Sequence, residues 1–131
     1  MSVKPWLQRY HTGIAEIDAH HEELLERMDG LYNALINQYE QKTIDGLIAN
    51  VIDVTIDHFA AEEKDMNRIS YAAAVEHSAS HQEFRSRLLA LRADNRGGRP
   101  VGTEALDVLN TYLSNHIKAH DLPFAKALRG G

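Results

Sequence analysis

Apolar residues recur three and four positions apart along most of the chain, and this spacing predicts amphipathic helices rather than strands. Four helices can be followed in this way. Asp18 is a good N-cap for the first and Thr43 for the second, the third begins near Ser70, and the fourth opens at Thr103. Their inward stripes read His21, Leu24, Met28, Leu31 and Leu35; Leu47, Val51, Val54, His58 and Glu62; His77, His81, Phe84, Leu88 and Leu91; and Leu106, Leu109, Leu113 and His116.

The connections between these helices are short, and the longest loop is the glycine-containing segment 94–100. Helices joined by short connections pack as antiparallel neighbours. We therefore predict an all-α fold: one domain over 1–131, built as an up-down-up-down four-helix bundle over about 18–121. Residues 1–17 form an N-terminal arm that packs across the bundle. Residues 122–131 form a short C-terminal turn, because Pro123 disfavours helix at Leu122.

Composition narrows the function classes. The formal net charge of −5 gives no basic footprint for nucleic acid. The chain has no cysteine, which excludes disulfides and thiolate metal sites. No run approaches the roughly 20 apolar residues of a membrane span, so we expect no membrane insertion. The start of the chain shows no apolar signal segment. We expect a cytoplasmic protein, and a monomer.

Histidines and carboxylates occupy positions on the inward stripes where apolar residues are expected. Residues four apart on a helix point the same way, as do His58 and Glu62, and His77 and His81. Any one of these histidines alone would fit an ordinary core or boundary position. Together they would leave a cluster of buried polar groups with few partners. Imidazole and carboxylate groups are common metal ligands, so the pattern predicts a metal site, with two ions.

A ligand count supports two ions. The candidate metal ligands are His21, His58, Glu62, His77, His81, His116 and Asp121. If both carboxylates bridge, the set supplies five nitrogens and four oxygens. A solvent-derived bridge would then occupy one position on each ion. Around two octahedral ions this leaves one position open for a small ligand.

Two positions in this set are ambiguous. His20 lies about 100° around the helix from His21, so both cannot easily reach one metal. We take His21 as the ligand and expect His20 at the boundary or surface. His120 follows His116 at good ligand spacing, whereas Asp121 would need a frayed or widened final turn. Periodicity alone favours His120, but charge favours Asp121, because a histidine set with only one carboxylate would leave the centre too positive.

Four spaced motifs resemble the haemerythrin family, specifically its single-domain bacterial members. They are Trp6 with Gly13 and Ile17-Asp18-Ala19-His20-His21; His58-Phe59-Ala60-Ala61-Glu62-Glu63 with Met66; His77 to His81 with Phe84; and Leu113, His116-Ile117 and Asp121. Each motif alone is weak, but their combination is specific and covers nearly the whole chain. The departure is His20, where the family usually has glutamine.

The resemblance implies a non-haem di-iron centre. By position, His77, His81 and His116 would bind one iron, and His21 and His58 the other. Glu62 and Asp121 would bridge the two irons together with an oxo or hydroxo group. The resemblance also implies reversible dioxygen binding at the iron with two histidines, for storage or for delivery to an oxygen-consuming enzyme, and no enzymatic activity.

Reversible binding needs a dry, apolar dioxygen pocket. Phe59 beside His58 and Leu113 one turn before His116 are its expected walls, with Leu24, Leu25 and Met28 as weaker candidates. Plain core packing is the alternative for each residue. We interpret Glu63 and Asp65 as part of a solvated face.

Other functions compete with this one. Sensing of dioxygen or iron is an alternative, although a single domain without a signalling module favours storage or delivery. A di-iron peroxidase or oxidase of the ferritin-like type would use Glu-x-x-His pairs, which this chain lacks. The ligand types also permit zinc or manganese. The last alternative is a helical interaction module with incidental histidines.

Overall fold

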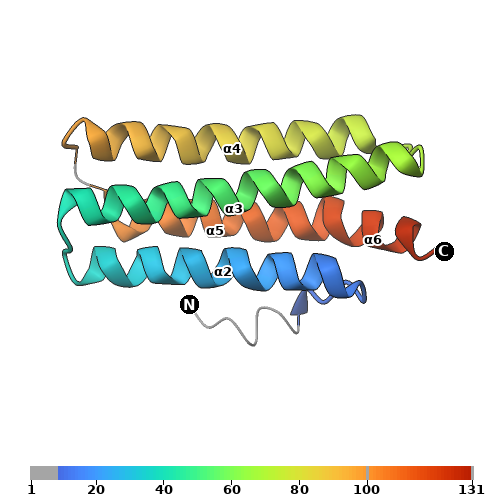
Figure 1. Ribbon diagram of the computed structural model, residues 1–131, viewed down its shortest axis with the longest axis horizontal. Helices are drawn as coiled ribbons and strands as arrows, with labels where there is room; N and C mark the ends of the chain where they lie inside the picture. Colours follow the sequence, from blue (N-terminus) through green and yellow to red (C-terminus); the bar gives the residue numbers. More distant parts are fainter. Residues whose placement is uncertain (1–8, 100, 131) are drawn as a thin grey trace.

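Four long helices lie side by side in the computed structural model, which describes residues 9–99 and 101–130 (Figure 1). They are α2 (Ala15–Ile36), α3 (Gln41–Arg68), α4 (Ala74–Arg96) and α5 (Thr103–His116), followed by a π-helix, η1 (Ile117–Asp121), and a short helix, α6 (Leu122–Leu128). Successive long helices run in opposite directions, and the described residues contain no strand. The predicted all-α, up-down-up-down bundle is confirmed.

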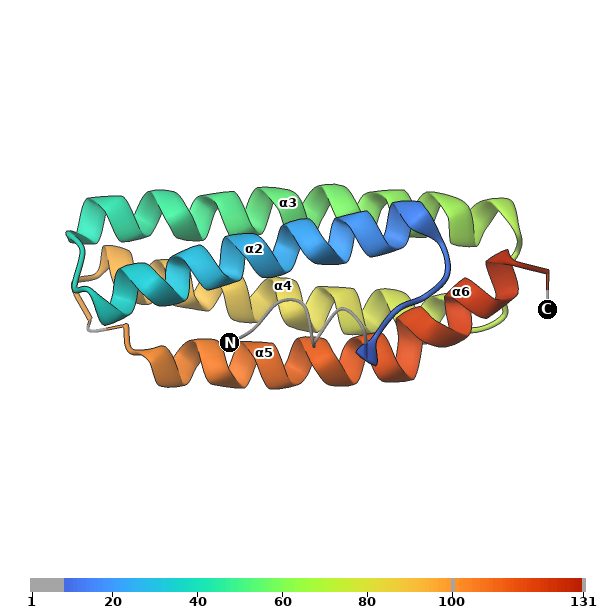
Figure 2. The ribbon, with the colours of Figure 1, turned by 90° about the horizontal axis from the view of Figure 1, so that it is seen from below.

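The antiparallel order gathers the polar stripe positions at one end of the bundle. His21 lies near the start of α2 and His77 near the start of α4, whereas His58 and His116 lie near the ends of α3 and α5. A cluster of buried apolar side chains fills most of the remaining core, and its central members, such as Leu31, are fully buried. Figure 2 shows α6 continuing beyond α5 at the polar end.

The helix starts differ from the sequence prediction. α2 begins at Ala15 rather than Asp18, so the last residues of the predicted arm are helical, and no side chain caps the helix. The Asp18 carboxylate instead accepts hydrogen bonds from the Thr12 backbone N–H (2.9 Å) and hydroxyl (2.7 Å). α3 likewise begins at Gln41, before the predicted cap Thr43. Local cap preferences were outweighed here by contacts with neighbouring segments.

The two ends of α4 also differ from the prediction. It begins at Ala74, because Ser70 adopts a positive φ of 51° in the preceding turn. It continues through Arg96, into the segment that we predicted as loop. Asn95 is buried, and its side-chain amide donates to the Gln41 carbonyl oxygen at 3.1 Å, while the Gln41 amide donates to the Asn95 carbonyl. These contacts with the start of α3 favour the extra turn.

The predicted interruption at Leu122 is wrong. Leu122 is helical (φ −65°, ψ −46°) and its N–H donates to the carbonyl of Ile117, five residues back, which defines a π-turn. Pro123 has no N–H to donate and its ring crowds the carbonyl four residues earlier, so a widened turn relieves the clash without ending the helix. The terminal segment is therefore a helix rather than a turn.

The described part of the arm packs on the bundle as expected. Tyr10 packs against the main core and Ile14 against a smaller cluster at the polar end. The Arg129 guanidinium donates to the Thr12 carbonyl oxygen, which joins the arm to the end of α6. Trp6 lies outside the described residues. Among the described helices, none is long and apolar enough to cross a membrane.

Candidate metal centre

All seven predicted ligands are buried together at the polar end of the bundle. Each side of the bundle contributes: α2, α3, α4 and α5 with η1 all send polar groups inward. The residues are at most 3% exposed: His21, His58, Glu62, His77, His81, His116 and Asp121. Water therefore cannot compensate these groups, and they must satisfy one another or bind something else.

The ring nitrogens of the five histidines converge on the two carboxylates. Glu62 Oε1 lies 3.1 Å from Nε2 of His77 and 3.0 Å from Nε2 of His81. The other oxygen of the same carboxylate, Oε2, lies 3.1 Å from Nε2 of His58. The two oxygens of Glu62 therefore face different histidines.

Asp121 repeats this division. Its Oδ1 lies 2.9 Å from Nε2 of both His77 and His116, and its Oδ2 lies 2.9 Å from Nε2 of His21. Oε1 and Oδ1 thus belong to the three-histidine side, and Oε2 and Oδ2 to the two-histidine side. This is the arrangement expected of two carboxylates that bridge a pair of cations.

The donor geometry fits two metal ions. One group of candidate ligands comprises Glu62, His77, His81, His116 and Asp121, and a second comprises His21, His58, Glu62 and Asp121. Within each group the ligand atoms lie within 4.8 Å of one another. Two ligands on opposite sides of an ion, each at about 2.1 Å, are about 4.2 Å apart, so each group is close to the size of a coordination sphere.

Several of these buried atoms also lack hydrogen bonds. His58 Nε2 and Glu62 Oε2 are close, as are His116 Nε2 and Asp121 Oδ1, but the angles do not make hydrogen bonds of these contacts. Lone pairs that are buried, close and yet not aimed at one another point to a common third partner. A cation between them would satisfy nitrogen and oxygen alike.

Charge couples the cluster strongly. Burial and the neighbouring Asp121 raise the pKa of Glu62, but the adjacent histidines outweigh both and hold this pKa well below its usual range. Burial likewise opposes ionisation of Asp121, but its close contacts with His116, His21 and His77 outweigh burial and hold its pKa well below its usual range. Both carboxylates are therefore ionised at neutral pH, as metal ligands must be.

The histidines respond in opposite directions. Burial lowers the pKa of His77, but its close contacts with the Asp121 and Glu62 carboxylates dominate and raise it from 6.5 to about 9. For His81 burial prevails over Glu62, and the pKa is lowered. Without metal, the cluster thus holds protons where cations would otherwise bind.

The π-helix decides which residue faces the cluster at the end of α5. Asp121 is 1% exposed and points inward, whereas His120 is partly exposed and belongs to neither ligand group. The His120 ring lies beside the rings of His77 and His116, at centroid distances of 5.5 and 5.4 Å. The widened turn that Asp121 requires is the one that η1 provides.

Two contacts behind the histidines were missed by the sequence analysis. The Nδ1 atom of His116 lies 2.6 Å from the Ser80 hydroxyl, and Nδ1 of His58 lies 2.9 Å from Nδ1 of His20. His20 is half-buried, as expected of a boundary residue. Each contact joins two different helices, and helical periodicity carries no signal for such pairs.

The predicted walls of the dioxygen pocket are buried in the main core: Leu24, Leu25, Met28, Phe59 and Leu113. The Phe59 ring stacks on His81, with ring centroids 3.8 Å apart. A pocket of about 120 Å³ between α3 and α4 includes both residues in its lining, together with Glu63. The Glu63 carboxylate is 39% exposed and its Oε1 lies 3.9 Å from His81 Nδ1.

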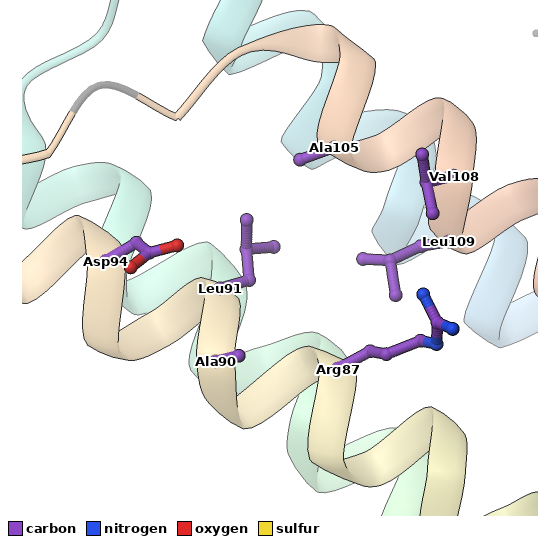
Figure 3. A pocket seen from close by; sticks show the side chains of 7 residues that line it. All are labelled: Arg87, Ala90, Leu91, Asp94, Ala105, Val108 and Leu109. Atoms are coloured by element: carbon purple, nitrogen blue, oxygen red, sulfur yellow. The ribbon is translucent and has the colours of Figure 1, made fainter.

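A second hollow, of about 250 Å³, opens between α4 and α5 and includes none of the seven cluster residues (Figure 3). Figure 3 shows Leu91, Val108 and Leu109 along it, with Arg87 and Asp94 at its two ends. Its lining is mainly apolar and carries no convergent metal ligands.

Comparison with known proteins matches the part of the chain that carries all seven candidate ligands to one protein family. Residues 12–128 match the model described as "Hemerythrin HHE cation binding domain". The bacteriohemerythrin of Pseudomonas aeruginosa (strain UCBPP-PA14) is 32% identical over 95% of this chain and 80% of its own. That of Stenotrophomonas maltophilia is 27% identical over 98% and 84%, and the myohemerythrin of Riftia pachyptila 24% over 91% and 88%. No solved structure matches.

Proposed function

This chain belongs to the haemerythrin family, and on that premise we propose that it binds dioxygen reversibly at a non-haem di-iron centre, for storage or for delivery to an oxygen-consuming enzyme. The observation that carries the proposal is the division of the carboxylate oxygens. One oxygen of Glu62 and one of Asp121 face three histidines, and the other two face His21 and His58.

The two groups would hold the irons unequally. His77, His81 and His116 with Oε1 and Oδ1 supply five protein donors to one ion. The second ion would receive four, from His21, His58, Oε2 and Oδ2. With one protein donor fewer, the second ion would keep one more open position than the first, and we assign the small ligand to that position. When bound, the iron pair supplies the two electrons that hold dioxygen reversibly.

Burial of the surrounding residues supports reversible binding over turnover. The Phe59 ring lies near ligands of both groups, with its centroid 3.8 Å from that of His81 and 5.8 Å from that of His58, and Leu113 is buried in the same core. Apolar walls exclude water and protons. Otherwise these would promote loss of the bound oxygen as peroxide and leave the irons oxidised. We assign no catalytic acid or base to this chain, and storage or delivery follows from a site that binds and releases.

The proposal is tested by loading metal-free protein with Fe(II) without air. We expect two irons per chain, and an absorption band that appears in air and disappears under vacuum over repeated cycles. Asp121→Asn should lower the iron content, whereas His120→Gln should keep both irons. Fewer than two irons in the parent protein would refute the proposal, as would a band that forms once and never reverses. Steady turnover of peroxide faster than loss of the air-induced band would identify an enzyme instead.

A further inference from the structure

His20 contacts a candidate metal ligand from the outside of the cluster. Its Nδ1 lies 2.9 Å from Nδ1 of His58, and the two rings meet edge to face, with centroids 4.8 Å apart and planes at 72°. His20 lies on α2 and His58 on α3, so the contact joins two helices. His58 is buried, and His20 is half-buried at the edge of the bundle.

Two ring nitrogens at this distance hold a single hydrogen between them, because two N–H groups would repel and two lone pairs would not bond. The Nε2 atom of His58 faces Glu62 and the interior of the cluster. If Nε2 donates its lone pair to a metal ion, the ring hydrogen must lie on Nδ1. Nδ1 of His20 must then accept that hydrogen, with the His20 ring hydrogen on its own Nε2.

We propose that His20 is a positioning residue for the two-histidine metal ion: it accepts the His58 Nδ1 hydrogen and thereby holds the Nε2 lone pair of His58 toward the metal. The inference rests on the proposed metal centre, and it assigns a role to a residue that belongs to neither group of candidate ligands. A glutamine side-chain oxygen can accept the same hydrogen, so His20→Gln changes the group but keeps an acceptor.

The other side of the cluster provides a matched case. Ser80 Oγ lies 2.6 Å from Nδ1 of His116, on the three-histidine side. On each side of the cluster, therefore, a side chain of a neighbouring helix contacts the outer nitrogen of a candidate ligand. Because the two-histidine ion has fewer protein donors, misorientation of His58 removes a larger share of its ligands than misorientation of His116 does on the other side.

The test is a stepwise Fe(II) titration of the metal-free protein without air, against a competing chelator. His20→Leu removes the acceptor at similar bulk and should weaken one of the two binding steps by about 10- to 100-fold, with the other unchanged. His20→Gln should restore that step to within a few-fold of the parent. Ser80→Ala should weaken the opposite step. In a His58→Gln background, His20→Leu should have no further effect on the remaining step.

Each outcome decides the proposal. Unchanged affinity at both steps in His20→Leu overturns it, and so does a His20→Gln variant as weak as His20→Leu, since bulk or packing would then be the cause. A second readout uses protein loaded with diamagnetic Zn(II): ¹⁵N NMR should find His20 with hydrogen on Nε2 and not on Nδ1. Hydrogen on Nδ1 would overturn the proposal independently. A parent protein that binds fewer than two irons refutes the di-iron function separately, before any variant is compared.

Discussion

Metal-free protein should lose stability as the pH rises from 6.5 to 9, because of His77. Its side chain is completely buried, and its close contacts with the Asp121 and Glu62 carboxylates raise its pKa from 6.5 to about 9 despite the burial. A group whose pKa is raised by folding stabilises the folded state while it is protonated there. This contribution is fully present below pH 6.5 and is lost as the pH rises through 9.

The magnitude follows from the two pKa values. Each tenfold change in proton affinity is worth about 1.4 kcal/mol, so the shift from 6.5 to about 9 corresponds to about 3 kcal/mol of unfolding free energy. The pKa of His58 is also raised, which acts in the same direction. The pKa values of His81, His20 and His120 are lowered, so these groups titrate below pH 6.5 and do not contribute in this window.

Urea denaturation of metal-free protein at pH 6.5 and pH 9 measures the effect directly. We expect a loss of about 3 kcal/mol, or a fall in Tm of about 10 °C. Protein loaded with two irons should lose much less, since a metal-bound ring nitrogen cannot take up the proton. His77→Asn should abolish most of the slope. Equal stability of the metal-free protein at the two pH values would refute this account of the cluster.

Four further predictions test the site and the fold. Phe59→Ala should lower the unfolding free energy by about 3–5 kcal/mol, since it empties a buried, stacked position. The variant should also shorten the lifetime of the air-induced absorption band. An unchanged lifetime would show that Phe59 does not line the dioxygen pocket. Glu62→Ala should reduce the iron content below two per chain, as read by metal analysis, whereas Asp57→Ala, at an exposed carboxylate on the same helix, should not. Gly46→Ala should raise the unfolding free energy by about 0.5–1 kcal/mol, since its Cβ meets no atom within 4 Å and alanine favours helix. Gly13→Ala should lower it, since φ is +82° and the new Cβ would lie 2.9 Å from an arginine nitrogen; melting curves that rank these two variants the other way would contradict the assignment.

The cluster could be predicted from sequence because its main signal is local. The spacing of His58 to Glu62 and of His77 to His81 sets their direction on a helix without reference to any partner. The bundle's antiparallel order then brings the four stripes to one end, since ligands near helix starts alternate with ligands near helix ends. Helical spacing and the antiparallel order of the helices are therefore sufficient to predict the fold and the convergence of most candidate ligands.

What periodicity did not settle depends on contacts between segments. The start of α2 at Ala15 and the extension of α4 to Arg96 depend on Thr12 and on Gln41, which lie outside the helix concerned. His20 and Ser80 have outer contacts across helices, where a sequence pattern has no fixed spacing to reveal. These are the places where tertiary structure overrides local preference.

The inward direction of Asp121 depends on residues that are not themselves candidate ligands. A regular α-helix after His116 would favour His120 as the inward residue, and only the widened turn brings Asp121 inward. Pro123 makes that turn favourable, because it has no N–H for a regular one. Contacts made by residues that follow the turn, in α6, then hold it in place.

The contacts that hold it come from α6 and the arm. Phe124 is fully buried and its ring meets His77 edge to face, at a centroid distance of 5.4 Å. Arg129 reaches the Thr12 carbonyl, and Thr12 in turn binds Asp18 at the start of α2. The last helix is thereby fixed to the first at the end of the bundle that holds the cluster. The short helix α6 supplies no candidate ligand itself. It contributes to the centre because it fixes the direction of Asp121, the residue just before it, whose carboxylate faces both groups of histidines.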